Sequence, residues 1–403
     1  MRVPLTSTGL RNQDVNAAIN VLKSGKLTIG KMVSQFEKEM AEYLGVKHFV
    51  MVNSGSSANL AIVEALVRPT LGKPKLNNGD GVIVPAIAWP TTIWPILQLG
   101  LTPIFVDIDP QNLVMDFNKA QKLVENKKNK IRAIFPIHPL GLSIDNSILE
   151  VFSKKNDLLI INDVCESLGS WNKNQHAGSV GIASTYSFYF SHHMTTMEGG
   201  GVATNLDSIA NDLRSIRSHG WSRDRFDRHK IEKNIDKSRQ KYLFVTTGFN
   251  IRPMEIQAAI GISQLKNLDK FVARRQIIAE QVSKALRNTK LSVIGDSYCH
   301  NPTLKQRHSW MLLPIKIRSS NSKARARITE FLGNRGVENR PVLTGNFLRQ
   351  PALRHMRNKP KFNEFKNATE IEKTSFLVSC HHDLSKSQVQ YLIDSLLKCE
   401  KLI

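Results

Sequence analysis

Short apolar runs separated by helical segments constrain the fold of this chain more than any other feature. Helical spacing of apolar residues predicts helices over residues 12–23, 31–44 and 58–67. The predicted strands cover residues 49–52, 82–84, 103–106, 133–136, 158–161 and 186–190. Strands that alternate with helices favour an α/β fold with a mostly parallel sheet between two helical layers. Such sheets bind ligands at the carboxyl ends of their strands, so we expect a site in the loops that follow.

The 403 residues are enough for two or three structural units. A long helix predicted over residues 254–286 leads away from the alternating region. Beyond residue 290 we expect a strand over 310–317 and helices over 322–335 and 386–398, which is an α+β pattern. We therefore predict a large α/β domain over residues 1–270 and a small C-terminal domain over residues 271–403.

The composition is that of an ordinary globular protein, with 41% hydrophobic and 22% charged residues. The net charge of +22 would suit a nucleic-acid partner, but basic and acidic residues are interleaved, as in residues 223–228, and no nucleic-acid-binding motif is present. No apolar run approaches the roughly 20 residues needed to cross a bilayer. The N-terminus shows no apolar core of a signal peptide. We expect a cytoplasmic protein with neither a nucleic-acid nor a membrane partner.

The four cysteines are widely scattered and form no C-x-x-C pair; they are Cys165, Cys299, Cys380 and Cys399. This spacing suggests neither a zinc site nor a disulfide framework. We expect reduced thiols and no metal site.

A small polar turn follows the first predicted strand and holds Gly55, Ser56 and Ser57 before the helix over 58–67. The N-terminus of a helix offers free N–H groups and a positive dipole end, which suit a phosphate. An ordinary capped helix accounts for the same residues.

Trp89 and Asp163 follow two later strands. Trp89 lies in a loop bracketed by prolines, where it either anchors the core or offers a stacking surface. Asp163 ends an apolar strand, where it either caps the next helix or presents a carboxylate to a ligand. Glu166 lies three residues further along the chain.

The segment over residues 186–204 combines the most reactive groups. An aromatic strand leads into two adjacent histidines, His192 and His193, and then into an acidic-glycine run at residues 198–201. A strand end holds side chains rigidly, and glycines let another group approach the backbone. The segment is therefore the best candidate for a reactive site.

This segment resembles the pattern S-F-x-x-x-K-x-x-x-x-G-E-G-G of the sugar-nucleotide aminotransferases, which are pyridoxal-phosphate (PLP) enzymes of fold type I, the aspartate aminotransferase-like fold. Ser187 and Phe188 match, but His192 stands where the family has the lysine that binds PLP covalently. Met197 stands where the family usually has glycine. The exchange of lysine for histidine resembles one branch, the nucleotide-sugar 3-dehydratases of colitose, ascarylose and related dideoxysugar pathways. The resemblance extends over residues 5–397, including a match to G-Y-N-x-R-x-x-E-I-Q-A-A at residues 248–259 and a dehydratase-like run at 345–351.

The resemblance implies PLP and its amine form, pyridoxamine phosphate, as cofactors, and a role for each matching residue. The implied cofactor-binding residues are Gly55, Ser56 and Ser57 at the phosphate, Trp89 stacked on the ring, Asp163 at the ring nitrogen, Glu166 at the ring hydroxyl, Ser187, and Asn250 from across a dimer interface. His192 is the implied catalytic base. His219 either reaches the active site of the partner subunit, as the dehydratase branch implies, or is a solvated histidine of a loop. The candidates for binding substrate are Glu338, Arg340 and Arg349. The two arginines are candidates because a guanidinium fork matches a carboxylate or a diphosphate.

The implied reaction removes the C3 hydroxyl of a nucleotide-linked 4-keto-6-deoxyhexose, in a homodimer with shared active sites. Residues 217–230 contain no cysteine for the iron-sulfur cluster of the ascarylose-type enzymes, so L-glutamate is the expected amino donor and reductant. The sequence leaves the nucleotide and the hexose open. It also leaves open an aminotransferase that uses another base, such as Lys173, and a non-catalytic homologue of the fold.

Overall fold

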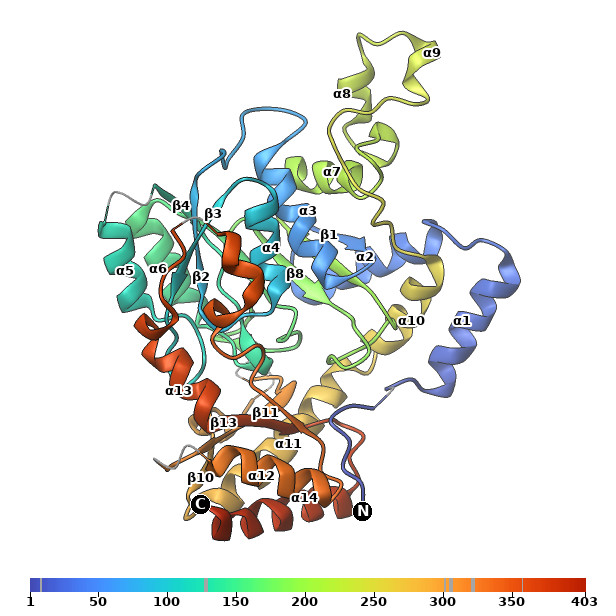
Figure 1. The fold of residues 1–403 in the computed structure, drawn as a ribbon. Helices are drawn as coiled ribbons and strands as arrows, with labels where there is room; N and C mark the ends of the chain where they lie inside the picture. The colour runs from blue at the N-terminus through green and yellow to red at the C-terminus, as the bar shows by residue number, and fades with distance from the viewer. Residues whose placement is uncertain (8, 127–129, 301, 304–306, 320–322, 357) are drawn as a thin grey trace.

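The computed structural model describes residues 1–403 except 8, 127–129, 301, 304–306, 320–322 and 357. A large sheet occupies the middle of the N-terminal part (Figure 1). Its strands, in spatial order, are β1 (His48–Val52), β9 (Gly200–Thr204), β8 (Ala183–Ser187), β5 (Leu159–Asp163), β4 (Ile131–Ile134), β2 (Gly81–Pro85) and β3 (Thr102–Val106). Only β9 runs antiparallel to its neighbours within this sheet. The predicted mostly parallel sheet is confirmed.

Helices cover both faces of this sheet because successive strand residues point to opposite sides. In β1, Val50 and Val52 pack with α3 and α4, whereas Phe49 and Met51 pack with α2 and α10. The helices of this part are α1 (Asn12–Ser24), α2 (Lys31–Leu44), α3 (Gly55–Val67), α4 (Pro90–Gln98), α5 (Phe117–Glu125), α6 (Asn146–Asn156), α7 (Asp207–Ile216), α8 (Arg228–Glu232), α9 (Lys237–Gln240) and α10 (Glu255–Leu265). The three-layer prediction is thus confirmed.

The C-terminal part contains a second, antiparallel sheet with its own apolar core. Its strands, in spatial order, are β10 (Leu291–Val293), β11 (Leu312–Ile317), β13 (Ser375–Ser379) and β12 (Asn339–Arg340), and its helices are α11 (Leu268–Leu286), α12 (Ala324–Asn334), α13 (Lys366–Thr374) and α14 (Lys386–Lys398). Two short strands, β6 (Trp171–Asn172) and β7 (Gln175–His176), form a separate pair. Val3 packs in the C-terminal core and bridges to Val337, while Phe347 packs in the core of the large sheet. The domain boundary at residue 270 stays a prediction.

Three predicted elements differ from the observed ones. The helix over 254–286 is two helices: α10 ends at Leu265, and Asn267 is the N-cap residue of α11, whose carbonyl accepts the N–H of Phe271 at 3.0 Å. The strand over 186–190 ends at Ser187, and the strand over 310–317 begins at Leu312 since Trp310 is left-handed, with φ of +47°. Residue 322, the predicted start of another helix, lies outside the described residues.

The four cysteines are unpaired, as expected. Within the described part of the chain, no helix combines the length and apolarity needed to span a bilayer.

Candidate active site

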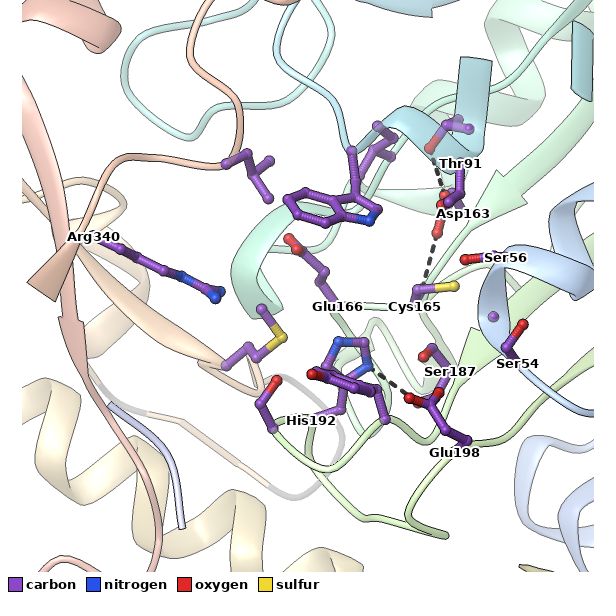
Figure 2. Close-up of a pocket in the computed structure, with 18 of the residues that line it drawn as sticks. Ser54, Ser56, Thr91, Asp163, Cys165, Glu166, Ser187, His192, Glu198 and Arg340 are labelled. Carbon is purple, nitrogen blue, oxygen red and sulfur yellow. Dashed lines mark hydrogen bonds between the residues drawn. The ribbon is translucent and has the colours of Figure 1, made fainter. Parts of the chain in front are cut away.

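A cavity of about 490 Å³ lies where β5 and β8 end, between the large sheet and the C-terminal unit (Figure 2). Eight of the predicted site residues line it: Gly55, Ser56, Trp89, Asp163, Glu166, Ser187, His192 and Arg340. They come from five separate segments of the chain, which the fold brings together.

Asp163 ends β5 and is held by three hydrogen bonds. Its Oδ2 accepts from Asn59 Nδ2 at 2.9 Å and from Thr92 Oγ1 at 2.7 Å, and its Oδ1 accepts from the N–H of Cys165 at 3.1 Å. These donors fix the direction of the carboxylate. Asp163 therefore offers a rigid negative charge to a cationic group in the cavity.

The N-terminus of α3 forms the adjacent side of the cavity. Ser54 caps this helix, with its Oγ accepting from the N–H of Ser57 at 3.1 Å. Gly55 packs so closely that a Cβ there would come within 2.5 Å of the Cβ of Ser187, so only glycine fits without a shift. The first N–H groups of a helix have no carbonyl partner inside it, and Gly55 and Ser56 of this first turn line the cavity. This end of α3 suits an anion.

His192 lies in the turn after β8, with its backbone N–H donating to the Tyr189 carbonyl at 3.0 Å. Its Nδ1 is 3.3 Å from the Ser187 carbonyl oxygen, a contact that suits a proton on Nδ1 and leaves Nε2 as the acceptor. Burial lowers the pKa of His192 to about 4, and the charge of Arg340 adds to the effect, while the Ser187 carbonyl opposes it. The imidazole is therefore neutral at pH 7 and able to accept a proton. The adjacent His193 is buried and does not line the cavity.

Glu166 projects into the cavity from the loop after β5 (Figure 2). One carboxylate oxygen accepts from the N–H of Leu140 at 2.9 Å. Burial raises the pKa of Glu166 to about 7, and the charge of Asp163 acts in the same direction, whereas Leu140 and Arg340 oppose it. Near neutral pH this side chain can therefore donate a hydrogen bond as well as accept one.

Trp89 and Arg340 present open groups to the cavity. Trp89 precedes α4 and is 56% exposed, so a face of its indole is available for stacking. Arg340 extends from β12 toward Glu166, and its guanidinium makes no hydrogen bond or ion pair with any described residue (Figure 2). It is a free binding group for an anion.

The other predicted site residues do not line this cavity. The hydroxyl of Ser57 donates to Asn53 Oδ1 at 2.6 Å. His219 and Asn250 are exposed and lie side by side, since the His219 N–H donates to the Phe249 carbonyl at 2.9 Å and Ser218 bridges to Asn250. Their predicted roles in a partner's site stay predictions.

Two of the three predicted substrate-binding residues also lie elsewhere. Glu338 accepts a hydrogen bond from Arg2 at 2.6 Å and another from the N–H of Leu5 at 2.9 Å, so it fixes the N-terminal segment beside β12. Arg349 is exposed, with its guanidinium 5.0 Å from the Phe362 ring centre and 3.6 Å from Glu372. In a single chain, Arg340 alone of the three reaches the cavity.

The sequence analysis missed the residues that hold Asp163 and several residues that line the cavity. Asn59 and Thr92 hold Asp163 but come from α3 and α4. Asn59 lies four residues after Gly55, so helical spacing could have placed Asn59 and Gly55 on the same face of α3. No local signal identifies the remaining lining residues, which are Ser54, Thr91, Ile137, Cys165, Tyr189, Ser191, Glu198, Met311, Pro341 and Leu343.

Met197 takes the place of the family glycine with φ of +69°, the left-handed conformation that glycine adopts most easily. Met197 therefore holds a backbone conformation that costs an L-residue more than it costs glycine.

One group of possible metal ligands lies outside the cavity. His381, His382 and Asp383 bring ligand atoms within 4.8 Å of one another. The absence of a metal site stays a prediction.

Residues 9–397 match the DegT/DnrJ/EryC1/StrS aminotransferase family. The chain is 34% identical to the GDP-4-keto-6-deoxy-D-mannose 3-dehydratase of Yersinia pseudotuberculosis, covering 98% of both chains. It resembles a structure of the E. coli GDP-4-keto-6-deoxy-D-mannose-3-dehydratase with bound hydrated PLP, with a TM-score of 0.89 and 33% identity over 98% of this chain and 99% of that one. It also resembles a structure of GDP-4-keto-6-deoxymannose-3-dehydratase with a trapped PLP-glutamate geminal diamine, with a TM-score of 0.88 and 33% identity over 98% of this chain and 100% of that one. The chain belongs to the DegT/DnrJ/EryC1/StrS aminotransferase family.

Proposed function

We propose that this protein is a PLP-dependent nucleotide-sugar 3-dehydratase that removes the C3 hydroxyl of a GDP-linked 4-keto-6-deoxyhexose for dideoxysugar biosynthesis. The observation that carries the proposal is His192, which lines the cavity where the aminotransferase pattern has lysine. Two similar proteins, at 34% and 33% identity, bear the name of this dehydratase.

The residues of the cavity fit PLP. The rigid carboxylate of Asp163 matches a protonated ring nitrogen, the N-terminus of α3 matches the phosphate, and the exposed indole of Trp89 can stack on the ring. Glu166 is placed to share a proton with the ring hydroxyl. When bound, PLP supplies an electron sink for carbanion chemistry.

Replacing lysine by histidine changes how the protein holds its cofactor. Imidazole cannot bind the cofactor covalently as lysine does, so Asp163, α3 and Trp89 must hold it by non-covalent contacts alone. His192 remains free to take a proton through Nε2, because its ring is neutral at pH 7 and only its Nδ1 contacts the Ser187 carbonyl. The side chain therefore serves as the base that removes a proton during loss of the C3 hydroxyl.

Arg340 provides the open anion-binding group for the substrates. Its guanidinium suits the carboxylate of L-glutamate or the diphosphate of the sugar nucleotide. Glutamate is the proposed amino donor, and a PLP-glutamate adduct has been trapped in a similar dehydratase. We propose a cytoplasmic homodimer in which His219 and Asn250 complete the partner's site.

Mass spectrometry of the products tests the proposal. The purified protein is incubated with PLP, L-glutamate and GDP-4-keto-6-deoxymannose, and the reaction is repeated without glutamate. We expect glutamate-dependent loss of the 3-hydroxyl, with release of ammonia and 2-oxoglutarate.

The H192N variant should lose this activity by about 100-fold or more, since a positioned base contributes roughly 10²- to 10⁴-fold. H229N, at an exposed histidine of α8, is the matched control. An amino sugar as the main product would indicate transamination instead, and no conversion of any GDP, CDP or dTDP 4-keto-6-deoxy sugar would favour a non-catalytic role.

A further inference from the structure

Arg275 is a fully buried arginine on α11, outside the cavity lining. Its Nη1 donates to the backbone carbonyls of Trp310 at 3.2 Å, Met311 at 2.8 Å and Cys380 at 3.2 Å. Its Nη2 donates to the backbone carbonyl of His192 at 3.3 Å. One side chain therefore connects α11 to three other segments that are distant in sequence, at residues 192, 310–311 and 380.

Two of these segments contribute residues to the lining of the cavity. The His192 turn extends from β8 of the large sheet, whereas Met311 lies just before β11 of the C-terminal sheet and also lines the cavity. Arg275 thus connects the backbone of the proposed base to the Met311 wall, the part of the cavity lining that Met311 provides. A shorter side chain would not span these carbonyls with the same planar fork.

The guanidinium has no carboxylate partner within ion-pair distance among the described residues. Burial lowers its pKa to about 10, so it remains a cation at neutral pH. A buried cation bonded only to carbonyls is unfavourable for stability. Its charge also acts on the nearby imidazoles and lowers the pKa of His192 after the larger effects of burial and Arg340.

We infer that Arg275 is a positioning residue for catalysis, which holds the His192 backbone against the Met311 wall so that the imidazole keeps its place in the cavity. This inference rests on the proposed function for its catalytic part. Its structural part, the restraint of the His192 turn, is independent of that function.

Three variants separate these effects. R275M removes the fork and the charge but keeps an unbranched apolar chain, and R275K keeps the charge without the fork. R274M is the matched control, because Arg274 is the adjacent arginine of α11 and donates to the Leu384 carbonyl at 3.1 Å without reaching the His192 turn.

The first measurement is backbone hydrogen exchange of residues 188–199 in the full chain with PLP and without substrate. We expect exchange about tenfold faster in R275M and unchanged in R274M. Equal exchange in R275M and wild type would overturn the restraint, whether or not the protein is a dehydratase.

The second measurement is kcat and KM for loss of the 3-hydroxyl. A misplacement of about 1 Å can cost roughly 10²-fold in rate. We therefore expect kcat to fall about 100-fold in R275M, with KM and the Kd for PLP within about threefold of wild type. The kcat of R275K should be about tenfold higher than that of R275M.

A kcat of R275M within threefold of wild type, or an equal loss in R274M, would overturn the inference. If R275M does not fold, R275K provides the test. A kcat of R275K within twofold of wild type, together with unchanged hydrogen exchange, would overturn the inference. Failure of the proposed function is distinguishable, because wild type itself would then be inactive while the exchange experiment still applies.

Discussion

Two sides of the cavity differ in how their charged side chains are held. We call the side at Asp163 the floor and the side at Arg340 the outer wall. On the floor, Asp163 is held by Asn59, Thr92 and Cys165 through three hydrogen bonds. On the outer wall, the side chain of Arg340 has no hydrogen-bond or ion-pair partner among the residues described. The floor belongs to the large sheet and the wall to the C-terminal sheet.

This difference indicates two kinds of ligand. A group with fixed partners keeps its geometry and suits a cofactor that stays bound through many turnovers. A group without partners is free to bind and release a substrate in every cycle. The comparison predicts that changes on the floor impair cofactor binding, whereas changes on the wall impair substrate binding.

The D163N variant tests the floor and should have the largest effect. Loss of one partner of a buried charge pair costs about 3–5 kcal/mol. We expect Kd for PLP, measured by fluorescence titration, to rise roughly 100- to 1000-fold, with activity falling in parallel. D116N is the control, because Asp116 caps α5 outside the cavity. Unchanged PLP affinity in D163N would contradict the comparison.

The R340Q variant tests the wall. A hydrogen bond to a charged group contributes about 1.5–3 kcal/mol, so KM for glutamate or the sugar nucleotide should rise roughly 10- to 100-fold. The substrate whose KM rises identifies the ligand of Arg340. R327Q is the matched control, at an exposed arginine of α12. A change in PLP affinity instead of KM would place Arg340 with the floor.

Glu166 lies between the two sides, and E166Q should have a smaller effect that depends on pH. The folded protein holds the proton of Glu166 up to about pH 7, whereas an unfolded chain releases it near the ordinary value of 4.5. Rising pH between these values therefore destabilises wild type but not E166Q. We expect E166Q to gain about 2–3 kcal/mol relative to wild type between pH 5 and pH 8.

Thermal unfolding across this pH range measures the gain. E364Q, at an exposed glutamate, is the control. A difference between E166Q and wild type that stays constant with pH would contradict a raised pKa of Glu166.

Met197 joins the His192 turn to β9, and M197G should have the smallest effect. The left-handed conformation costs about 1–2 kcal/mol for an L-residue, and glycine removes this cost. Glycine also makes the unfolded chain more flexible, which offsets about 0.5–1 kcal/mol of the gain in stability. We expect M197G to be more stable by about 0.5 kcal/mol in denaturant unfolding. M254G, at an exposed methionine with φ of −100°, should instead lose stability. Destabilisation of M197G would show that its side chain packs usefully.

Periodicity alone was sufficient to predict the layered sheet, because alternating strand residues and amphipathic helices report burial locally. Residues 386–398 form the predicted helix to the residue, as α14. Element ends were less predictable. Tyr189 and Phe190 continue the aromatic pattern of β8, yet they are exposed and the strand ends at Ser187. Tyr189 lines the cavity instead of continuing the strand, so the aromatic pattern did not mark the strand end.

The sequence by itself determined the family, the large sheet, and the placement of Asp163 and His192 after strands. These features depend on neighbours in the chain, so local patterns reveal them. Only the tertiary structure decided that Asn59 and Thr92 hold Asp163, that Arg340 faces them, and that Arg275 holds the His192 turn. The residues in these contacts are far apart in sequence, and they meet because helices and sheets pack in one arrangement that no local pattern encodes.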